Sequence, residues 1–328
     1  MSYIPGLFPR QQPERLIYEV REAASGGDRR SLARLPWRLY RGDRYWKPPS
    51  RRSRVRSLSP KYNPSLKQVS LALFVAEAQN GVLGAEIIGG IAVWLPADSQ
   101  GSSIAHFGMF EVTNNPEVAE TLIEAAESWL VEQFPIEAIR GPFSLDGRQL
   151  PGLLTDGFNV RSAPGLPYNL PYYPEIIEGA GYAPFQTART YLVPARTSSG
   201  PPQVRLIGET GTGFCITWDE DGQTLEAMIV SPDALGPSSR LPEQLLHLRM
   251  LRRSGRRLLA RPAGDSVGPE WDDRRLALWR AVAGVAARLG YDEVLLGPIP
   301  DDDKMIPDAL VTLGARPAHT YQVFEKAF

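Results

Sequence analysis

One order of predicted segments, strand–helix–strand–short helix–strand, occurs twice along this chain. In the first half Asn115 and Pro116 suit the start of a long helix, because asparagine caps free backbone N–H groups and proline fits the first helical turn. In the second half a helix is expected over 271–289, where apolar residues recur at helical spacing, and Gly290 is expected to end it. A repeated order of this kind predicts an α/β (or α+β) protein with two related units rather than one large sheet.

The strands of both units are predicted from short runs rich in β-branched and aromatic residues. They cover 71–77, 87–94, 104–112, 138–140 and 187–193 in the first half, and 204–209, 212–218, 225–230, 257–261, 293–296 and 321–325 in the second. Short helices are expected over 173–178 and 305–313, while residues 14–24 fit a strand or a short helix equally well.

The length of 328 residues is too great for one ordinary hydrophobic core and suits two domains. Residues 197–202 are small and polar and are expected to link two strand-like segments. We therefore expect an N-terminal domain over 1–197, with a basic and aromatic arm and a proline-rich loop, and a shorter C-terminal domain over 198–328.

Composition argues against several classes of protein. The net charge of -1 gives no overall attraction to nucleic acid or to an anionic membrane. Cys215 is the single cysteine, which excludes an intramolecular disulfide and argues against a cysteine-based zinc site. The first residues lack a signal-peptide pattern, and the most apolar run, 87–97, is shorter than the roughly 20 residues that span a bilayer. We expect a soluble cytoplasmic protein without a metal site.

Short motifs follow one another in a distinctive order. They are 37–43 (WRLYRGD), 46–49 (WKPP), 58–64 (LSPKYNP), 107–111 (FGMFE), 141–143 (GPF), 152–154 (GLL), 157–158 (GF), 168–173 (YNLPYY) and 181–182 (GY), then Tyr291, 301–305 (DDDKM), 313–315 (LGA), Tyr321 and 325–326 (EK). In order and spacing they resemble a family of bacterial tandem GNAT-like (N-acetyltransferase-fold) proteins of poorly defined function. The resemblance covers nearly the whole chain. It implies two GNAT-like acyl-CoA N-acyltransferase-fold domains with mixed central sheets flanked by helices, and acetyl-CoA or another acyl-CoA as the cofactor.

The resemblance also locates the place where such enzymes bind the diphosphate of acetyl-CoA, a glycine-rich loop at the start of a helix. In the first domain residues 113–117 contain no glycine, Pro116 lacks an N–H, and Glu117 brings negative charge. In the second domain residues 262–273 keep two glycines among four acidic residues. The candidate cofactor-binding residues are Asn114, Asn115, Arg261, Gly264 and Gly268.

A tyrosine general acid, which many of these enzymes carry four residues before the glycine that ends the short helix, is missing. The same count gives Ile177 before Gly181 and Leu310 before Gly314, and neither side chain can donate a proton. The diphosphate loop and the general acid therefore both depart from the pattern of an active enzyme.

Glu111 is the candidate catalytic residue, because it ends a strand next to the helix start, where a general base often lies in these enzymes. Burial would raise the pKa of its carboxyl toward a useful value. Tyr168, Asn169, Tyr172 and Tyr173 are the candidate substrate-binding residues. Two interpretations of them stay open: they line a ligand cleft beside Glu111, or they cover a proline-rich loop.

Arginines alternate with aromatic residues between Arg29 and Arg56, a pattern that suits nucleic acid or an acidic ligand. The simpler interpretation, which we prefer, is a solvated arm whose aromatic rings pack on the first sheet. Two functions remain in balance: a catalytically degenerate GNAT-fold protein that binds a small molecule or a protein partner, and an N-acyltransferase that moves an acyl group from acyl-CoA to an amine. Nucleic-acid binding is the least supported, and the oligomeric state is left open.

Overall fold

The structure is a computed structural model. It describes residues 16–67, 69–80, 84–96, 103–145, 151–163, 166–196, 204–209, 214–220, 223–232, 257–262, 279–280, 282–284, 286–287, 292–301 and 310–328, with only the backbone between 204 and 262.

In this described part of the chain thirteen strands form one mixed sheet. They are β1 (Tyr18–Glu22), β2 (Ser70–Asn80), β3 (Gly84–Leu95), β4 (Ile104–Val112), β5 (Ala138–Phe143), β6 (Leu153–Asp156), β7 (Ala183–Pro194), β8 (Val204–Glu209), β9 (Phe214–Glu220), β10 (Gln223–Pro232), β11 (Arg257–Pro262), β12 (Glu293–Pro300) and β13 (Arg316–Ala327). Their order is β1-β2-β3-β4-β5-β13-β7-β12-β11-β10-β9-β8, and β6 pairs with β13 outside this path. The predicted strands are present, most of them with longer ends.

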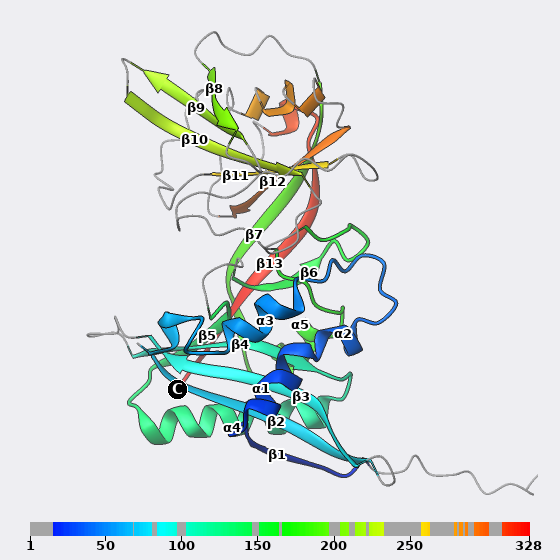
Figure 1. The fold of residues 1–328 in the computed structure, drawn as a ribbon, viewed down its shortest axis with the longest axis vertical. Helices are drawn as coiled ribbons and strands as arrows, with labels where there is room; N and C mark the ends of the chain where they lie inside the picture. The colour runs from blue at the N-terminus through cyan, green and yellow to red at the C-terminus, as the bar shows by residue number, and fades with distance from the viewer. Residues whose placement is uncertain are drawn as a thin grey trace, which may run out of the picture.

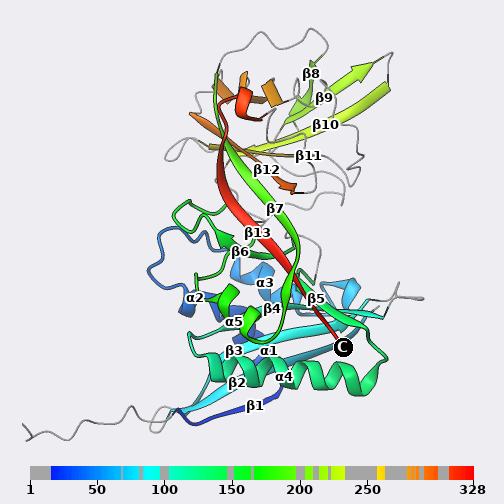
Figure 2. The ribbon, with the colours of Figure 1, turned by 180° about the vertical axis from the view of Figure 1, so that it is seen from behind.

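Strands β7 and β13 join the two halves of the sheet. β13 pairs antiparallel with β5 on one side and with β7 on the other, while β7 also pairs with β12. Both views show these two strands as a long ribbon between the lower and upper parts (Figures 1 and 2). The two predicted units therefore share one continuous sheet, because the last strand of the chain is inserted into the sheet of the first half. The boundary at 197–198 stays a prediction.

Helices cover both faces of the first half (Figures 1 and 2). They are α1 (Gly26–Arg34), α2 (Pro36–Leu39), α3 (Arg51–Ser57), the 3-10 turn η1 (Pro64–Lys67), α4 (Pro116–Gln133) and α5 (Tyr173–Gly179). Side chains of β2 alternate between the two faces: Phe74 belongs to the core under α4, whereas Leu73 and Val75 belong to the core under α1 and α3. Glycine at position 90 lets α1 approach the sheet, since a Cβ there would lie 2.4 Å from Leu32 Cδ1.

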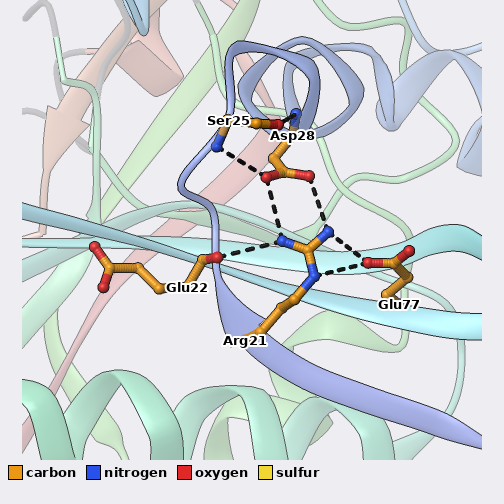
Figure 3. Close-up of polar contacts among 5 residues, drawn as sticks. All are labelled: Arg21, Glu22, Ser25, Asp28 and Glu77. Carbon is orange, nitrogen blue, oxygen red and sulfur yellow. Dashed lines mark hydrogen bonds and ion pairs between the residues drawn. The ribbon is translucent and has the colours of Figure 1, made fainter.

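A polar network holds the turn from β1 into α1 (Figure 3). The guanidinium of Arg21 donates to Glu77 Oε2 on β2 at 2.8 and 2.5 Å and to both carboxylate oxygens of Asp28 at 2.9 and 3.2 Å. Asp28 and Ser25 cap the start of α1 reciprocally, each accepting the other's backbone N–H at 3.0 Å. The network orients α1 and the arm that follows it on the sheet.

The long helix α4 begins as predicted, with Asn115 as its cap and Pro116 in its first turn. In the second half the described residues between 279 and 287 are helical and bury Trp279, Val282 and Ala286. The ends predicted for that helix lie outside the described residues. The sequence analysis missed α1, α2 and α3 in the arm, and β6.

Candidate functional site

The site lies where β4 separates from β5. The two strands pair in parallel from Ile104, opposite Ala138, to Gly108, opposite Phe143. They approach closely at this end, since a Cβ on Gly108 would lie 2.1 Å from the Phe143 carbonyl oxygen. Met109 then has a φ of 50°, a left-handed conformation, and the pairing of β4 with β3 shifts at the same place. The last residues of β4 continue beyond the paired stretch of β5.

Glu111 is buried on this last part of β4, with 5% of its surface exposed. Its Oε2 accepts hydrogen bonds from the hydroxyls of Tyr40, at 2.5 Å, and Tyr173, at 3.2 Å. Its Oε1 accepts from Arg54 Nη2 at 2.6 Å. Tyr40 follows α2, Arg54 belongs to α3 and Tyr173 begins α5, so three elements distant in sequence meet at one carboxylate.

Burial dominates the electrostatics of this cluster. Desolvation raises the pKa of the Glu111 carboxyl, although the Arg54 charge and the two tyrosine hydroxyls act in the opposite direction. Desolvation, with the nearby Glu111 charge, also raises the pKa of the Tyr40 and Tyr173 hydroxyls well above the ordinary value. Both tyrosines therefore remain protonated donors at neutral pH, and the expectation of a raised carboxyl pKa agrees with the geometry.

The hydroxyls of Tyr172 and Tyr173 form hydrogen bonds with the backbone at the end of β4. The N–H of Val112 donates to the Tyr173 hydroxyl at 3.1 Å, and the Val112 carbonyl accepts from the hydroxyls of Tyr172 at 2.6 Å and Tyr173 at 3.3 Å. The two rings stack with their centroids 4.8 Å apart. Burial raises the pKa of Tyr172 to about 12. Tyr172, which precedes α5, and Tyr173, its first residue, thus bond backbone groups of β4 beyond the stretch that pairs with β5.

Tyr168 and Asn169 belong to the loop before α5. The Tyr168 hydroxyl donates to Asp43, and its ring meets the Tyr40 ring edge to face at 5.8 Å. The amide of Asn169 is buried, bonding both the N–H and the carbonyl of Leu154 on β6, at 2.7 and 2.9 Å. Asn169 thus holds the loop to β6, and its predicted contact with a substrate stays a prediction, as do those of the three tyrosines.

The arm contributes two site residues that the sequence analysis did not single out, Tyr40 and Arg54. Tyr40 is part of the hydrophobic core, with its ring 5.0 Å from that of Trp46. The expectation that aromatic residues of the arm pack on the first sheet is confirmed for Tyr40. The signal that points to Arg54 is its place in α3: Arg52 and Arg56 lie four residues apart on one side of the helix, and Arg54 lies between them in sequence and therefore on the other side.

The start of α4 lies directly after this site. Asn115 caps this helix start, because its Oδ1 accepts the Val118 N–H at 3.2 Å and its carbonyl accepts the Ala119 N–H at 3.1 Å. Pro116 has no N–H, and the exposed Glu117 adds negative charge. These residues do not fit a diphosphate group, which needs free N–H groups and no adjacent carboxylate.

Solved structures share this architecture over nearly the whole chain. A tandem GNAT protein from the clavulanic acid biosynthesis pathway, solved without acetyl-CoA, has a TM-score of 0.55 and 11% identity, covering 95% of this chain and 98% of its own. A GCN5-related N-acetyltransferase from Sphaerobacter thermophilus has a TM-score of 0.50 and 14% identity, covering 96% of both chains. The chain has the GNAT fold. The resemblance to tandem GNAT-like proteins is confirmed at the level of the fold.

A third solved structure with the GNAT fold is a glucosamine N-acetyltransferase region of a fungal multi-domain β-N-acetylglucosaminidase. Its TM-score is 0.56 and its identity 12%, over 99% of this chain and 40% of that chain. No family model matches the sequence.

Two curated proteins are similar in sequence to half of this GNAT-fold chain. Protein YghO of Escherichia coli is 34% identical over 163 residues, 50% of this chain and 41% of the relative. A bacterial ceramide synthase of Caulobacter vibrioides is 32% identical over 157 residues, 48% of this chain and 40% of the relative. The chain thus matches about two fifths of the length of each relative.

The other candidate cofactor-binding residues of the GNAT fold are not brought together by the described structure. Asn114 is exposed before α4, and Arg261 belongs to β11, where its backbone lies opposite Ile229 of β10. Gly264 and Gly268 lie outside the described residues. Within the described ranges no helix has the length and apolar character to cross a bilayer, and no group of three or more His, Cys, Asp or Glu residues is placed to hold a metal ion.

Proposed function

We propose that the chain is an N-acyltransferase, which joins an acyl group from a thioester to an amine at the Glu111 site. The observation that carries the proposal is a buried glutamate with a raised pKa on β4, between two tyrosine hydroxyls and an arginine. The GNAT fold and the similarity to a protein named a ceramide synthase support it. A ceramide is the fatty amide of a long-chain amino alcohol, so a long-chain amine is the first substrate to test.

In the proposed reaction the amine nitrogen attacks the thioester carbonyl carbon, the N–C bond forms and the C–S bond breaks. The Glu111 carboxylate accepts the proton that the amine loses. The Tyr173 hydroxyl, 3.2 Å from Glu111 Oε2, is the group that returns a proton to the departing thiolate. The charge of Arg54 lowers the pKa of the Glu111 carboxyl and so favours its ionised form, in opposition to burial. Because the start of α4 does not fit a diphosphate, no step is assigned to the nucleotide part of coenzyme A.

The test is amide formation, followed by mass spectrometry, from sphinganine and a hexadecanoyl thioester. Glu111→Gln should lower the rate by about 10²–10⁴-fold, the usual contribution of a general base. Glu120→Gln, the same change at an exposed site on α4, should leave it unchanged. For the wild type kcat/KM should rise with pH until Glu111 is ionised, through a pKa above the ordinary glutamate value. Absence of amide, or an unaffected Glu111→Gln, would refute the proposal.

A second function, ligand binding without catalysis, is favoured by one observation. Tyr172 and Tyr173 form hydrogen bonds with the backbone carbonyl and N–H of Val112 at the end of β4. An acyl donor that bound this strand would need the same backbone groups. A chain of this kind would form no amide, yet its melting temperature would rise with hexadecanoyl thioester or sphinganine.

A further inference from the structure

The segment 29–67 concentrates positive charge. It contains thirteen Lys and Arg residues and one acidic residue, Asp43, so its net charge is +12, whereas the rest of the chain carries -13. Ten of the thirteen cations are exposed. The total charge is near zero, yet this segment forms a strongly cationic surface. Local charge of this kind governs association with an oppositely charged partner.

The centre of this surface is the exposed part of α3. Arg51, Arg52 and Arg56 are exposed, and among the described residues none of the three contacts a carboxylate. The guanidinium of Arg51 lies 5.4 Å from the Trp37 ring centroid, and that of Arg56 lies 4.7 Å from the Tyr62 ring centroid. Guanidinium groups thus contact these two rings, which disfavours stacking of nucleic-acid bases there.

The same helix covers the candidate site. Arg54, between the exposed arginines in sequence, reaches inward to Glu111 at 2.6 Å. Its Nε atom is buried without a hydrogen-bond partner in the described part of the chain. A partner held by the exposed part of α3 would therefore lie within one helix diameter, about 10–12 Å, of the Glu111 carboxylate.

From these observations we propose that the cationic surface docks a small acidic carrier protein, which presents the acyl thioester on a phosphopantetheine arm. The inference rests on the proposed function and deepens it by naming the donor. Two independent features support it: the positive surface beside the site, and the start of α4, which does not fit the diphosphate of a nucleotide donor. A carrier-bound thioester has the same reactive group without that diphosphate.

The test measures binding of the carrier protein in the absence of an amine. Its result therefore does not depend on whether the chain forms an amide. Hexadecanoyl-loaded bacterial acyl carrier protein is titrated calorimetrically into the full chain and into Arg51→Gln/Arg52→Gln/Arg56→Gln. Loss of three exposed charge pairs should raise Kd roughly tenfold and weaken its dependence on salt.

The matched control makes the same charge change on the β7–β13 ribbon and the residues next to it: Arg189→Gln/Arg196→Gln/Arg316→Gln. It should bind the carrier like the wild type. An equal loss in the control, an unaffected α3 variant, or binding of hexadecanoyl-CoA, anionic vesicles or single-stranded DNA in place of the carrier would overturn the inference. Carrier binding that depends on α3, without amide formation, would support the inference and refute only the proposed reaction.

Discussion

Removal of Arg54 should expose the energetic cost of burying Glu111. The two side chains are 14% and 6% exposed and join through Arg54 Nη2 and Glu111 Oε1 at 2.6 Å. When one partner of a buried ion pair is lost, the remaining charge is uncompensated, which costs about 3–5 kcal/mol. Arg54→Met keeps the length of the side chain and removes its charge. At roughly 2–4 °C for each kcal/mol, the melting temperature should fall by about 6 °C or more.

The deficit should depend on pH in a defined direction. Burial already raises the pKa of Glu111 in the folded protein, and loss of the arginine charge raises it further. Folded protein then keeps this proton to a higher pH than unfolded protein does. Stability is therefore lost as pH rises from the unfolded pKa to the folded pKa, by up to about 1.4 kcal/mol per pH unit. Arg54→Met should be closest to the wild type in acid and furthest from it above neutral pH.

Urea unfolding at pH 5 and pH 8 measures both effects, with two controls. Arg52→Met makes the same change on the exposed side of α3 and should stay within about 0.5 kcal/mol of the wild type. Arg54→Met/Glu111→Gln removes both charges and should recover most of the loss. If Arg54→Met is no less stable than Arg52→Met, or if its deficit is equal at the two pH values, the reasoning about a buried charge is wrong.

Three other substitutions test contacts that stabilise the first half of the chain, again by urea unfolding. Gly90→Ala should cost about 1–3 kcal/mol, because its Cβ would overlap a side chain of α1. Gly26→Ala, whose Cβ would have nothing within 4 Å, should be neutral or stabilising. Equal effects of the two substitutions would contradict the close packing of α1 on Gly90. Lys326→Met leaves the buried Glu127 unpaired and should cost about 3 kcal/mol, and adding Glu127→Gln should restore stability; no restoration would exclude the ion pair as the cause. Asp28→Asn should lose stability at pH 7, and the gap to the wild type should begin to narrow only below about pH 4, because the arginine on β1 holds the pKa of Asp28 well below its ordinary value and the stabilisation is lost as pH falls from the unfolded pKa to the folded pKa; a gap as large at pH 2 as at pH 7 would contradict this.

Local features of the sequence were sufficient to predict most strands of the first half and its long helix α4. The cap of α4 depends on Asn115, Pro116 and the N–H of Val118, all within three residues, and its buried face repeats at helical spacing. The strands of the first sheet follow from runs of β-forming residues, because alternation along a strand is also a short-range property. Glu111 was singled out because it lies at the end of a strand, and the structure places it in a buried polar cluster.

Only the tertiary structure decided which residues meet. Arg54 is 57 residues from Glu111, and Tyr173 is 62 residues from it, so no spacing in the sequence predicts those contacts. The three short helices of the arm carry few apolar residues, and their packing on the sheet, allowed by Gly90, determines where Arg54 points. The insertion of β13 between β5 and β7 likewise depends on strand pairing over more than 100 residues, which local patterns do not specify.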